Sequence, residues 1–268
     1  MLKIGIIGAG GRMGRHCIAA VIADPDARLA AALEAEGSPF LGQDAACVAG
    51  LPACGVHIQA DTAAAFAAAD VMVDFSFCGA FPAVLREALR AKKPLVVGTT
   101  GLCPEDMQAI LDAAKRIPVF QSNNYSIGIA VLRELVQTAA KKLGKNFDIE
   151  IVETHHRHKK DAPSGTAITL AEAAAAGRGY RPEDAFCYGR EGISGERPER
   201  EIALHALRGG EVVGEHTVYF FGEAERLMLG HSADSRMNFA LGAIRAASWL
   251  AAQPPGRYGI EHLLAPDA

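Results

Sequence analysis

The sequence predicts an α/β fold, in which a Rossmann-type dinucleotide-binding domain carries an inserted α+β domain with a mixed or antiparallel sheet. Three observations support this. An apolar strand at the N-terminus runs directly into a glycine-rich turn and a helix, and further βα units follow up to about residue 126. Residues 127–236 then change to strands separated by short turns, before a last apolar helix. We therefore expect a dinucleotide domain of residues 1–126 plus 237–268 and a second domain of residues 127–236.

The first βα unit has the features of a dinucleotide-phosphate site. Leu2 to Ile7 is a short apolar strand, glycines follow it, and apolar residues recur with helical spacing after them. Glycine allows a tight turn and close backbone approach, and a helix N-terminus presents free N–H groups to pyrophosphate. The strict G-x-G-x-x-G spacing is not met, because Met13 occupies its last position. The expected cofactor contacts in this turn are Gly8, Ala9, Gly10, Gly11, Arg12 and Met13.

The second predicted strand, Arg28 to Leu33, ends at Glu34. An acid at this position is where the adenosine ribose hydroxyls are held in such folds. A glutamate on the surface is common, but the order strand, glycines, helix, strand and acid is not. The sequence therefore favours binding of a nicotinamide dinucleotide, with Glu34 as a contact.

Three later strands end in small polar residues. These strands are Val71 to Ser76, Pro94 to Val97 and Val119 to Gln121, with helices predicted at Ala80 to Ala91 and from Pro104 to about Arg116. In an open parallel sheet the ligand lies beyond the carboxyl ends of the strands, so these tails are expected to border the nicotinamide half of the cofactor. Each tail alone is also typical of ordinary turns. The additional predicted cofactor contacts are Gly98, Thr99, Thr100, Ser122, Asn123, Asn124 and Tyr125.

The second domain is predicted to begin with a helix, Ile127 to Leu143, and a strand, Phe147 to Thr154. Ile202 to Leu207 and Val212 to Phe221 flank a Gly-Gly turn and indicate a hairpin, with a further strand at Arg226 to His231. Gly177 to Arg200 is rich in Gly, Pro, Arg and Glu and is expected to be a long loop. The apolar helix Asn238 to Ala252 is expected to return to the nucleotide domain.

The segment Glu153 to Ala167 carries the strongest chemical signal. Its residues 155–160 hold three histidines, one arginine and two lysines, and a Pro-Ser-Gly-Thr turn that can start a helix follows. This combination offers proton donors near neutral pH, fixed positive charge and free N–H groups, which suit protonation of a small polyanion. A solvated basic loop or a nucleic-acid contact is the alternative. A three-histidine metal site is disfavoured, because neighbouring histidines on a strand diverge and no acidic or cysteine cluster completes a shell.

Composition limits the class of protein. The chain has 268 residues, half of them hydrophobic, and a net charge of −4, which argues against a generally nucleic-acid-binding surface. No apolar run is long enough to span a bilayer, and the first residues form a strand that the fold needs rather than a signal peptide. Six scattered cysteines are expected to be reduced thiols in a cytoplasm.

With these parts placed, the chain resembles the 4-hydroxy-tetrahydrodipicolinate reductase family over nearly its whole length. The most specific part is the H-H-R-H-K-x-D-A-P-S-G-T-A string within Glu153 to Ala167. Other matching segments are Gly8 to Gly14, Gly98 to Gly101, Ser122 to Tyr125, Gly214 to Thr217 and Ser235 to Met237. The resemblance implies an NAD(P)H-dependent reduction of a cyclic dicarboxylate to tetrahydrodipicolinate in diaminopimelate and lysine biosynthesis. It also implies a homotetramer joined through the inserted sheet, so that residues 127–236 bind substrate and mediate oligomerisation.

The resemblance also assigns roles to residues. His155 matches the acid/base residue of the family, and Lys159 matches the proton donor, whose charge also suits a substrate carboxylate. His156 matches a substrate-binding residue. Gly165 and Thr166 match contacts to a substrate carboxylate, and together with Ser164 they form a turn at a helix N-terminus that is expected to hold this anion.

One departure bears on the choice of cofactor. Family members that use NADPH well carry a basic residue after the acid that ends the second strand, whereas Ala35 follows Glu34 here. Arg12 and Arg15 can compensate in part, but NADH is favoured. Two other functions remain open: an NAD(P)-dependent dehydrogenase of another amino-acid intermediate with the same architecture, and a non-enzymatic nucleotide-sensing module that binds nucleic acid.

Overall fold

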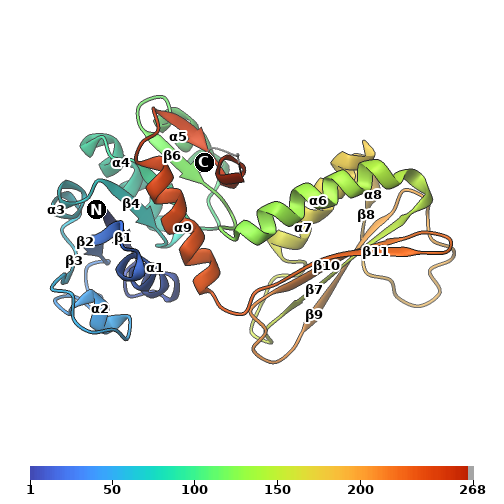
Figure 1. Ribbon diagram of the computed structural model, residues 1–268, viewed down its shortest axis with the longest axis horizontal. Coiled ribbons are helices and arrows are strands. Elements are labelled where there is room, and N and C mark those ends of the chain that lie inside the picture. Colours follow the sequence, from blue (N-terminus) through green and yellow to red (C-terminus); the bar gives the residue numbers. More distant parts are fainter. Residues whose placement is uncertain (265–268) are drawn as a thin grey trace. The chain divides into compact units, whose positions relative to one another are not determined.

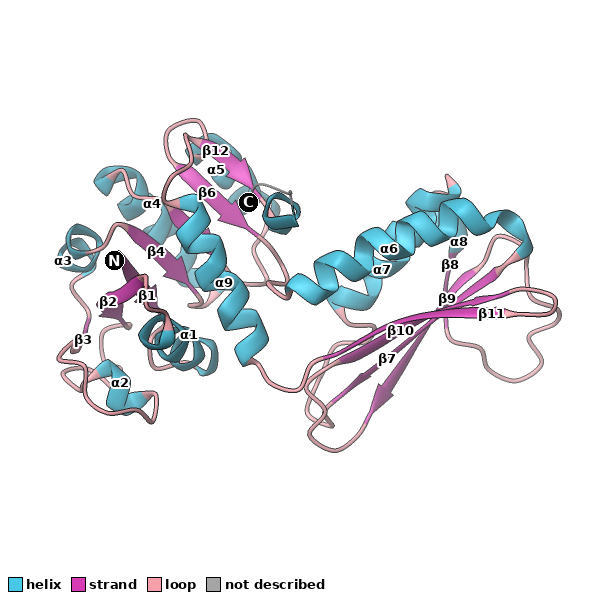
Figure 2. Cartoon of the chain, viewed as in Figure 1, coloured by secondary structure: helices cyan, strands magenta, loops and turns pink. Residues whose placement is uncertain are grey.

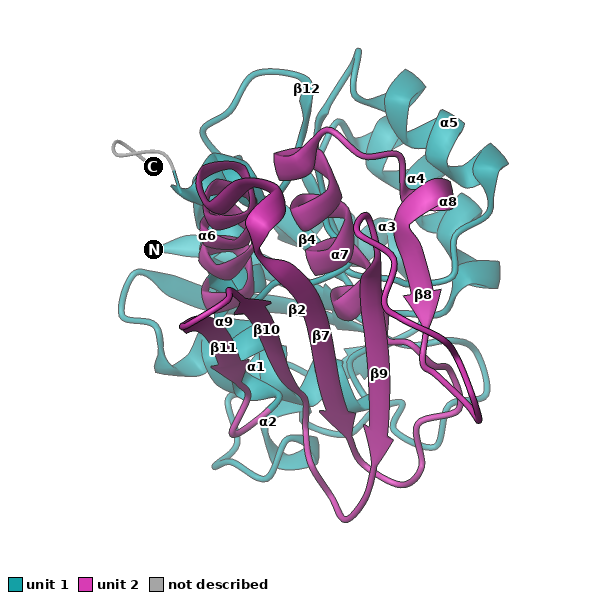
Figure 3. Cartoon of the chain, turned by 90° about the vertical axis from the view of Figure 1, so that its right-hand side faces the viewer, with its two compact units in different colours: residues 1–127, 236–268 teal, residues 128–235 magenta. Residues whose placement is uncertain are grey.

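The computed structural model describes residues 1–264 and divides into two compact units. Unit 1 comprises residues 1–127 and 236–268, and unit 2 comprises residues 128–235 (Figure 3). No helix within residues 1–264 is both long and apolar enough to cross a membrane.

Unit 1 contains a seven-stranded parallel sheet with the strand order β12-β6-β5-β4-β1-β2-β3. The helices α3, α4 and α5 bury their apolar sides on one face of this sheet, and α1 and α9 cover the other (Figure 2). The strands are β1 (Leu2–Ile7), β2 (Ala27–Leu33), β3 (Ile58–Gln59), β4 (Val71–Asp74), β5 (Leu95–Val97), β6 (Pro118–Gln121) and β12 (Gly256–Tyr258). The helices are α1 (Arg12–Ala23), α2 (Ala45–Val48), α3 (Thr62–Ala68), α4 (Phe81–Ala91), α5 (Pro104–Ala113) and α9 (Met237–Leu250), with 3₁₀ turns η1 (Cys78–Ala80) and η3 (Ile260–Leu264).

The last long helix returns to the first sheet, as the sequence predicted. α9 packs along α1 and against β4, β5 and β6 (Figure 1). Its Gly242 lies so close to the chain after β6 that an added Cβ would fall 1.8 Å from the carbonyl oxygen of Tyr125. Close approach of two backbones is one of the uses of glycine. The sequence reading placed no elements between Glu34 and Val71, where the structure has α2, β3 and α3.

Unit 2 contains a five-stranded mixed sheet with the strand order β11-β10-β7-β9-β8. Helices α6 and α7 pack on one face and form the apolar core with it. In Figure 3 these two helices lie behind the strands, and no helix of unit 2 lies in front. The strands are β7 (Asp148–His155), β8 (Phe186–Tyr188), β9 (Ile202–Arg208), β10 (Glu215–Phe221) and β11 (Arg226–Ser232). The helices are α6 (Ile127–Leu143), α7 (Gly165–Arg178) and α8 (Pro182–Ala185), with the 3₁₀ turn η2 (Gly144–Asn146).

The hairpin predicted around the Gly-Gly turn is wrong. β9 and β10 do not pair with each other, because β7 lies between them; β9 runs parallel to β7, and β10 runs antiparallel to it. The connection between them crosses the carboxyl end of β7, where Gly209 N donates to His155 O (3.0 Å) and Arg157 N donates to Gly210 O (3.1 Å). The chain segment that resembled a hairpin turn therefore surrounds the start of the basic run.

The long loop predicted from Gly177 to Arg200 is also partly wrong. α7 continues to Arg178, and α8 and the edge strand β8 follow it, so that only residues 189–201 connect β8 to β9 without regular structure. β8 extends the sheet by pairing in parallel with β9. The Pro and Gly content of this segment concealed a strand of three residues, which is too short to show a period of two.

Candidate functional site

The glycine turn of unit 1 is shaped to hold a pyrophosphate against α1. Gly8 has a φ of 76°, and a Cβ on Gly14 would lie 2.0 Å from Gly8 O, so the helix lies directly on the turn. α1 begins at Arg12, and the N-cap residue Gly11 provides no side-chain cap. The first turn of the helix can therefore donate N–H groups to an anion. The residues present fit a dinucleotide.

Glu34 lies against this turn, at the position expected for an acid that holds ribose hydroxyls. Its carboxylate accepts from Gly10 N (2.7 Å) and from Ala35 N (3.3 Å). Arg15 donates from Nε to Gly10 O (2.8 Å), and its guanidinium lies over the Phe40 ring, 5.1 Å from the centroid. A carboxylate therefore stands at the end of β2, and Arg15 is held by contacts of its own.

The tails of β4 and β5 are joined by a buried carboxyl group that the sequence analysis missed. Asp74 has no exposed surface; its carboxyl accepts from Ser76 N (2.9 Å) and from Thr99 Oγ1 (2.9 Å). Burial raises the pKa of Asp74 above its usual value, and these hydrogen bonds oppose the rise. Asp74 thus holds Thr99 and the Gly98 to Thr100 tail next to the end of β4.

The tail of β6 lies next in the sheet, so the three polar tails are neighbours as predicted. Ser122 donates from Oγ to Asn124 O (2.6 Å), and Asn124 Oδ1 accepts from Ser126 N (2.8 Å), which closes a compact turn. Asn123 is exposed. Tyr125 is different: its side chain is buried, and its hydroxyl donates to Val97 O (2.8 Å). This phenol supports the sheet, so that only its backbone can contact a ligand.

The site in unit 2 is built on the buried face of β7. Every second residue of this strand faces the helices α6 and α7: Ile149, Ile151, Glu153 and His155. A carboxylate therefore follows two apolar core residues on this face. Glu153 has no exposed surface, yet it accepts hydrogen bonds from His155, Arg208 and Ser164. Burial opposes ionisation of Glu153, but these three donors outweigh it and lower its pKa to about 2. The carboxylate is therefore ionised at neutral pH.

Glu153 fixes the orientation of His155. Nδ1 of His155 lies 2.6 Å from Glu153 Oε2; because an ionised carboxylate can only accept, Nδ1 carries the proton of this hydrogen bond. The opposite nitrogen, Nε2, faces Gly214, where an added Cβ would approach it to 3.0 Å. The absence of a side chain at Gly214 keeps space beside Nε2, the nitrogen that is left for exchange of a proton.

His216, on the neighbouring strand β10, and Ser164, at the start of α7, support this arrangement. The rings of His155 and His216 meet edge to face with centroids 5.2 Å apart, and His216 Nε2 lies 3.1 Å from Ser164 Oγ. Ser164 is the N-cap of α7, accepts from Ala167 N (3.2 Å) and donates its own N–H to Glu153 (3.0 Å). With 2 % of its surface exposed, Ser164 stabilises the turn rather than facing a ligand, whereas Gly165 beside it is exposed and has open space around it.

Lys159 and His156 lie on the loop that follows β7. Lys159 Nζ pairs with both carboxylate oxygens of Asp161, at 2.9 and 2.8 Å, and its side chain is 20 % exposed. His156 lies just beyond the end of the strand, half-buried, with its ring 6.1 Å from that of His158. Unit 2 thus brings His155, Lys159 and the start of α7 into one region through Glu153 and its partners.

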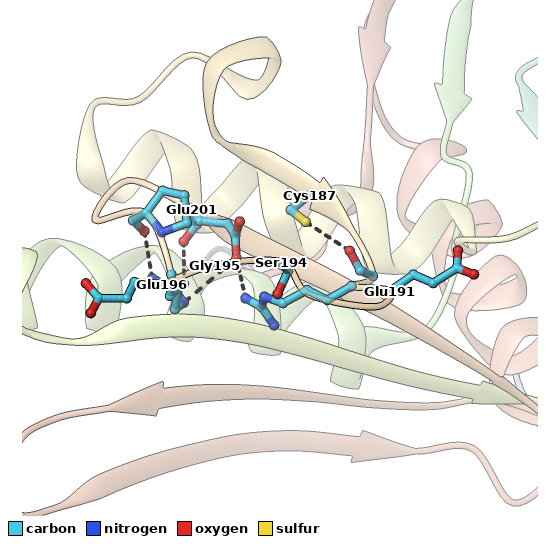
Figure 4. A pocket seen from close by; sticks show the side chains of 10 residues that line it. Cys187, Glu191, Ser194, Gly195, Glu196 and Glu201 are labelled. Atoms are coloured by element: carbon cyan, nitrogen blue, oxygen red, sulfur yellow. Dashed lines mark hydrogen bonds and ion pairs between the residues drawn. The ribbon is translucent and has the colours of Figure 1, made fainter.

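A second group of charges in unit 2 lies on the opposite face of the sheet and is already paired. Ten residues of the segment 187–201 line a pocket there (Figure 4). Arg190 and Arg197 donate to Glu150 and to oxygens of Glu201, and His205 also contacts Glu150. Burial raises the pKa of Glu150, but these donors outweigh it and lower it to about 2. This network ties the 189–201 segment to the sheet.

Because His216 is buried, we expect the stability of the protein to depend on pH. Burial, and then the neighbouring His155, lower the pKa of His216 from 6.5 to about 4, with further effects from Glu153, His231 and Lys159. Between pH 6.5 and pH 4, His216 is protonated in the unfolded chain but neutral in the folded chain. The free energy of unfolding therefore falls as the pH falls from 6.5 toward 4. The slope for one group is at most about 1.4 kcal/mol per pH unit.

We therefore expect His216→Gln to flatten this part of the stability curve. Urea unfolding at pH 7.0, 6.0 and 5.0 measures it, with the exposed His57→Gln as the control. Glu153 does not contribute to the slope above pH 5, because its lowered pKa reduces stability only as the pH falls from 4.5 toward 2. Equal slopes for the native and His216→Gln proteins would contradict the prediction.

Comparison with known proteins gives a consistent result for both units. The family models described as the N-terminus and the C-terminus of dihydrodipicolinate reductase match residues 2–125 and 128–264. The chain is 47 % identical over 264 residues to the 4-hydroxy-tetrahydrodipicolinate reductase of Anaeromyxobacter dehalogenans, covering 98 % of each. It is 46 % identical over 263 residues to the same enzyme of Halorhodospira halophila, again covering 98 % of each.

Solved structures agree on the fold. A dipicolinate-bound dihydrodipicolinate reductase from Paenisporosarcina sp. TG-14 superposes with a TM-score of 0.75 at 24 % identity, covering 98 % of this chain and 100 % of that one. A myo-inositol dehydrogenase from Corynebacterium glutamicum superposes with a TM-score of 0.59 at 18 % identity, covering 96 % and 90 %. The two-unit architecture is thus common to enzymes with different substrates.

Proposed function

Because this chain belongs to the dihydrodipicolinate reductase family, we propose how its two sites divide the work of that reaction. The enzyme reduces 4-hydroxy-tetrahydrodipicolinate to tetrahydrodipicolinate with NAD(P)H, in diaminopimelate and lysine biosynthesis. The matching of both family models, one to each unit, carries this conclusion. A gain of a hydride and a proton with loss of water requires a cofactor site and a proton donor.

Unit 1 holds the cofactor in this proposal. The turn from Gly8 to Met13 and the first turn of α1 receive the pyrophosphate, Glu34 accepts from the ribose hydroxyls, and the tails of β4, β5 and β6 border the nicotinamide. The bound cofactor supplies the hydride. Asp74 keeps the Gly98 to Thr100 tail in place, which supports the proposed contact although Asp74 does not itself face the ligand.

Unit 2 binds the dicarboxylate and supplies the proton. The N–H groups of Gly165 and Thr166 at the start of α7 receive one carboxylate, where the helix dipole favours negative charge. Lys159 and His156 provide positive charge and hydrogen bonds beside it. His155 exchanges a proton through Nε2, because Glu153 binds Nδ1. Lys159 is the second proton donor, and Asp161 holds its ammonium group at the edge of the site until substrate binds.

The first test separates the proton donors from the carboxylate contacts. Removal of a positioned acid or base typically lowers the rate by about 10²–10⁴-fold. We expect His155→Gln and Lys159→Ala to lower kcat by this amount. Thr166→Val keeps the backbone N–H but removes the hydroxyl, which we propose as a second contact of Thr166 to the carboxylate, so it should mainly raise KM for the dicarboxylate.

Steady-state kinetics measures these changes, with the substrate made freshly by the preceding enzyme of the pathway. Binding of NADH without substrate should stay normal in all three variants, and it serves as the control for folding. A nearly normal kcat in both His155→Gln and Lys159→Ala would remove their proposed roles. Equal activity with aspartate or diaminopimelate would favour a dehydrogenase of another amino-acid intermediate.

We further propose that NADH is used at least as well as NADPH. Glu34 places a negative charge beside the glycine turn, Ala35 adds no positive charge, and Arg15 is engaged with Gly10 and Phe40. A 2′-phosphate would therefore meet repulsion from Glu34, against which Arg12, exposed at the start of α1, compensates only in part.

Ala35→Arg should then improve kcat/KM for NADPH more than for NADH, and Ala35→Met controls for side-chain size. Kinetics of the native enzyme and of both variants with each cofactor gives the answer. A native preference for NADPH of tenfold or more, which corresponds to about 1.4 kcal/mol, would show that position 35 does not decide the choice.

We also propose that the face of the second sheet that carries no helix joins four chains. Leu207, Tyr219, Phe221 and Met228 lie on this face by their strand register. Leu207 and Met228 are more than half exposed, and the rings of Tyr219 and Phe221 stack with centroids 5.6 Å apart. An exposed apolar sheet face of this kind favours association.

Light scattering should give about four times the chain mass of 28.2 kDa. Met228→Glu should lower this mass. The control is Leu241→Glu, which changes an exposed leucine on α9 in unit 1 and should leave the mass unchanged. A native protein that remains monomeric would contradict the proposal.

A further inference from the structure

Arg208 occupies a central place in unit 2 that neither the basic run nor the proposed reaction explains. It is the last residue of β9 and stands opposite His155 in the parallel ladder between β7 and β9. Only 20 % of its side chain is exposed. Its Nη1 and Nη2 each donate to the Glu153 carboxylate at 2.8 Å, and Nη2 also donates to the carbonyl oxygen of Asp161 at 2.8 Å.

Each of these contacts leads to one of the two proposed proton donors. Glu153 binds the Nδ1 proton of His155 through the same Oε2 that accepts from Arg208 Nη1. Asp161, whose carbonyl Arg208 holds, pairs through its side chain with Lys159. The guanidinium therefore connects a strand that carries one donor to a loop that carries the other.

We propose that Arg208 is a positioning residue for the reaction: it holds Glu153 against His155 and the 156–161 loop beside it, and so fixes His155 and Lys159 relative to each other. This inference rests on the proposed roles of those two residues. Arg208 itself contacts neither Nε2 of His155 nor the ammonium group of Lys159, so it acts through Glu153 and Asp161.

The geometry requires arginine rather than any cation. A guanidinium is planar and donates in several fixed directions, whereas a lysine ammonium is a compact charge on a flexible stem. Lysine at this position can neutralise the buried carboxylate. It cannot make a two-pronged bond to Glu153 and reach the Asp161 carbonyl at the same time. Charge compensation and positioning can thus be separated by substitution.

The experiment uses Arg208→Lys, Arg208→Met and the control Arg181→Met, which removes an exposed arginine paired with Asp184 in α8. We expect Arg208→Lys to keep a melting temperature near that of the native enzyme but to lose kcat, by up to about 10²-fold, as for a small misplacement of reacting groups. NADH binding without substrate should not change. Arg208→Met should lose both kcat and thermal stability, because it leaves a buried carboxylate without its cation.

A second measurement shows whether Arg208 acts through the two donors. The loss caused by Arg208→Lys should be at least about threefold smaller in a His155→Gln or Lys159→Ala background than in the native one, since groups that act together give non-additive effects. The same factor in all three backgrounds would reduce Arg208 to a general structural role. So would recovery of full kcat by lysine.

A third measurement does not depend on activity. The amides of Arg157 and Lys159 are hydrogen-bonded within the loop and its neighbour, to Gly210 O and His156 O. Both should exchange with solvent faster in Arg208→Lys, and amides of α7 should not. If His155→Gln and Lys159→Ala prove active, the proposed roles fail, but this exchange still shows whether Arg208 orders the loop. Unchanged exchange at both amides would overturn the positioning role whatever the kinetics show.

Discussion

The buried charge of Glu153 is the constraint on which the proposed substrate site of unit 2, with His155, Lys159 and the start of α7, depends. A carboxylate without solvent contact is unstable unless it is paired and hydrogen-bonded. Its donors come from the end of its own strand, from the end of β9 and from the start of α7. Satisfying this one group therefore sets the position of His155, of Arg208 and of the turn at Ser164. The same hydrogen bonds that allow Glu153 to be buried therefore also set the geometry of the proposed proton-transfer site.

The topology of the mixed sheet makes these bonds possible. β9 and β10 pair with opposite edges of β7, so their connection has to cross its carboxyl end. This crossing places Arg208 on one side of His155 and Gly214 on the other. In a hairpin of β9 and β10, which the Gly-Gly turn favoured, β7 could not lie between the two strands, so Arg208 and Gly214 could not stand on opposite sides of His155. The pairing of strands far apart in the sequence thus decides the surroundings of the proposed acid/base residue.

Local patterns predicted the nucleotide unit well. β1, the glycine turn, α1, β2 and α4 lie where period and turn residues placed them, because each depends on neighbours in sequence. The basic run predicted a substrate site at the end of β7 from neighbouring residues alone, and that site stays a prediction. Arg208 and His216 could not be found in this way, since only strand register brings them to the run. Glu153 offered a signal that was overlooked: it interrupts the alternating apolar face of a strand, two residues before a histidine.

The two units consequently differ in whether the proposed site is held by backbone or by side chains, and so in how strongly a single substitution should disturb it. In unit 1 the framework of the proposed phosphate site is backbone: Gly8 and Gly14 approach other main-chain atoms, and α1 begins beside them. The side chain at position 35 is exposed and takes no part in that framework, so we expect a change of cofactor preference there to leave the fold intact. In unit 2 the framework is made of side chains that also carry the proposed chemistry. On the proposed roles, a change at Glu153 or Arg208 should alter stability and proton transfer together, and a substitution that keeps the charge but alters the geometry, such as Arg208→Lys, is expected to separate the two effects.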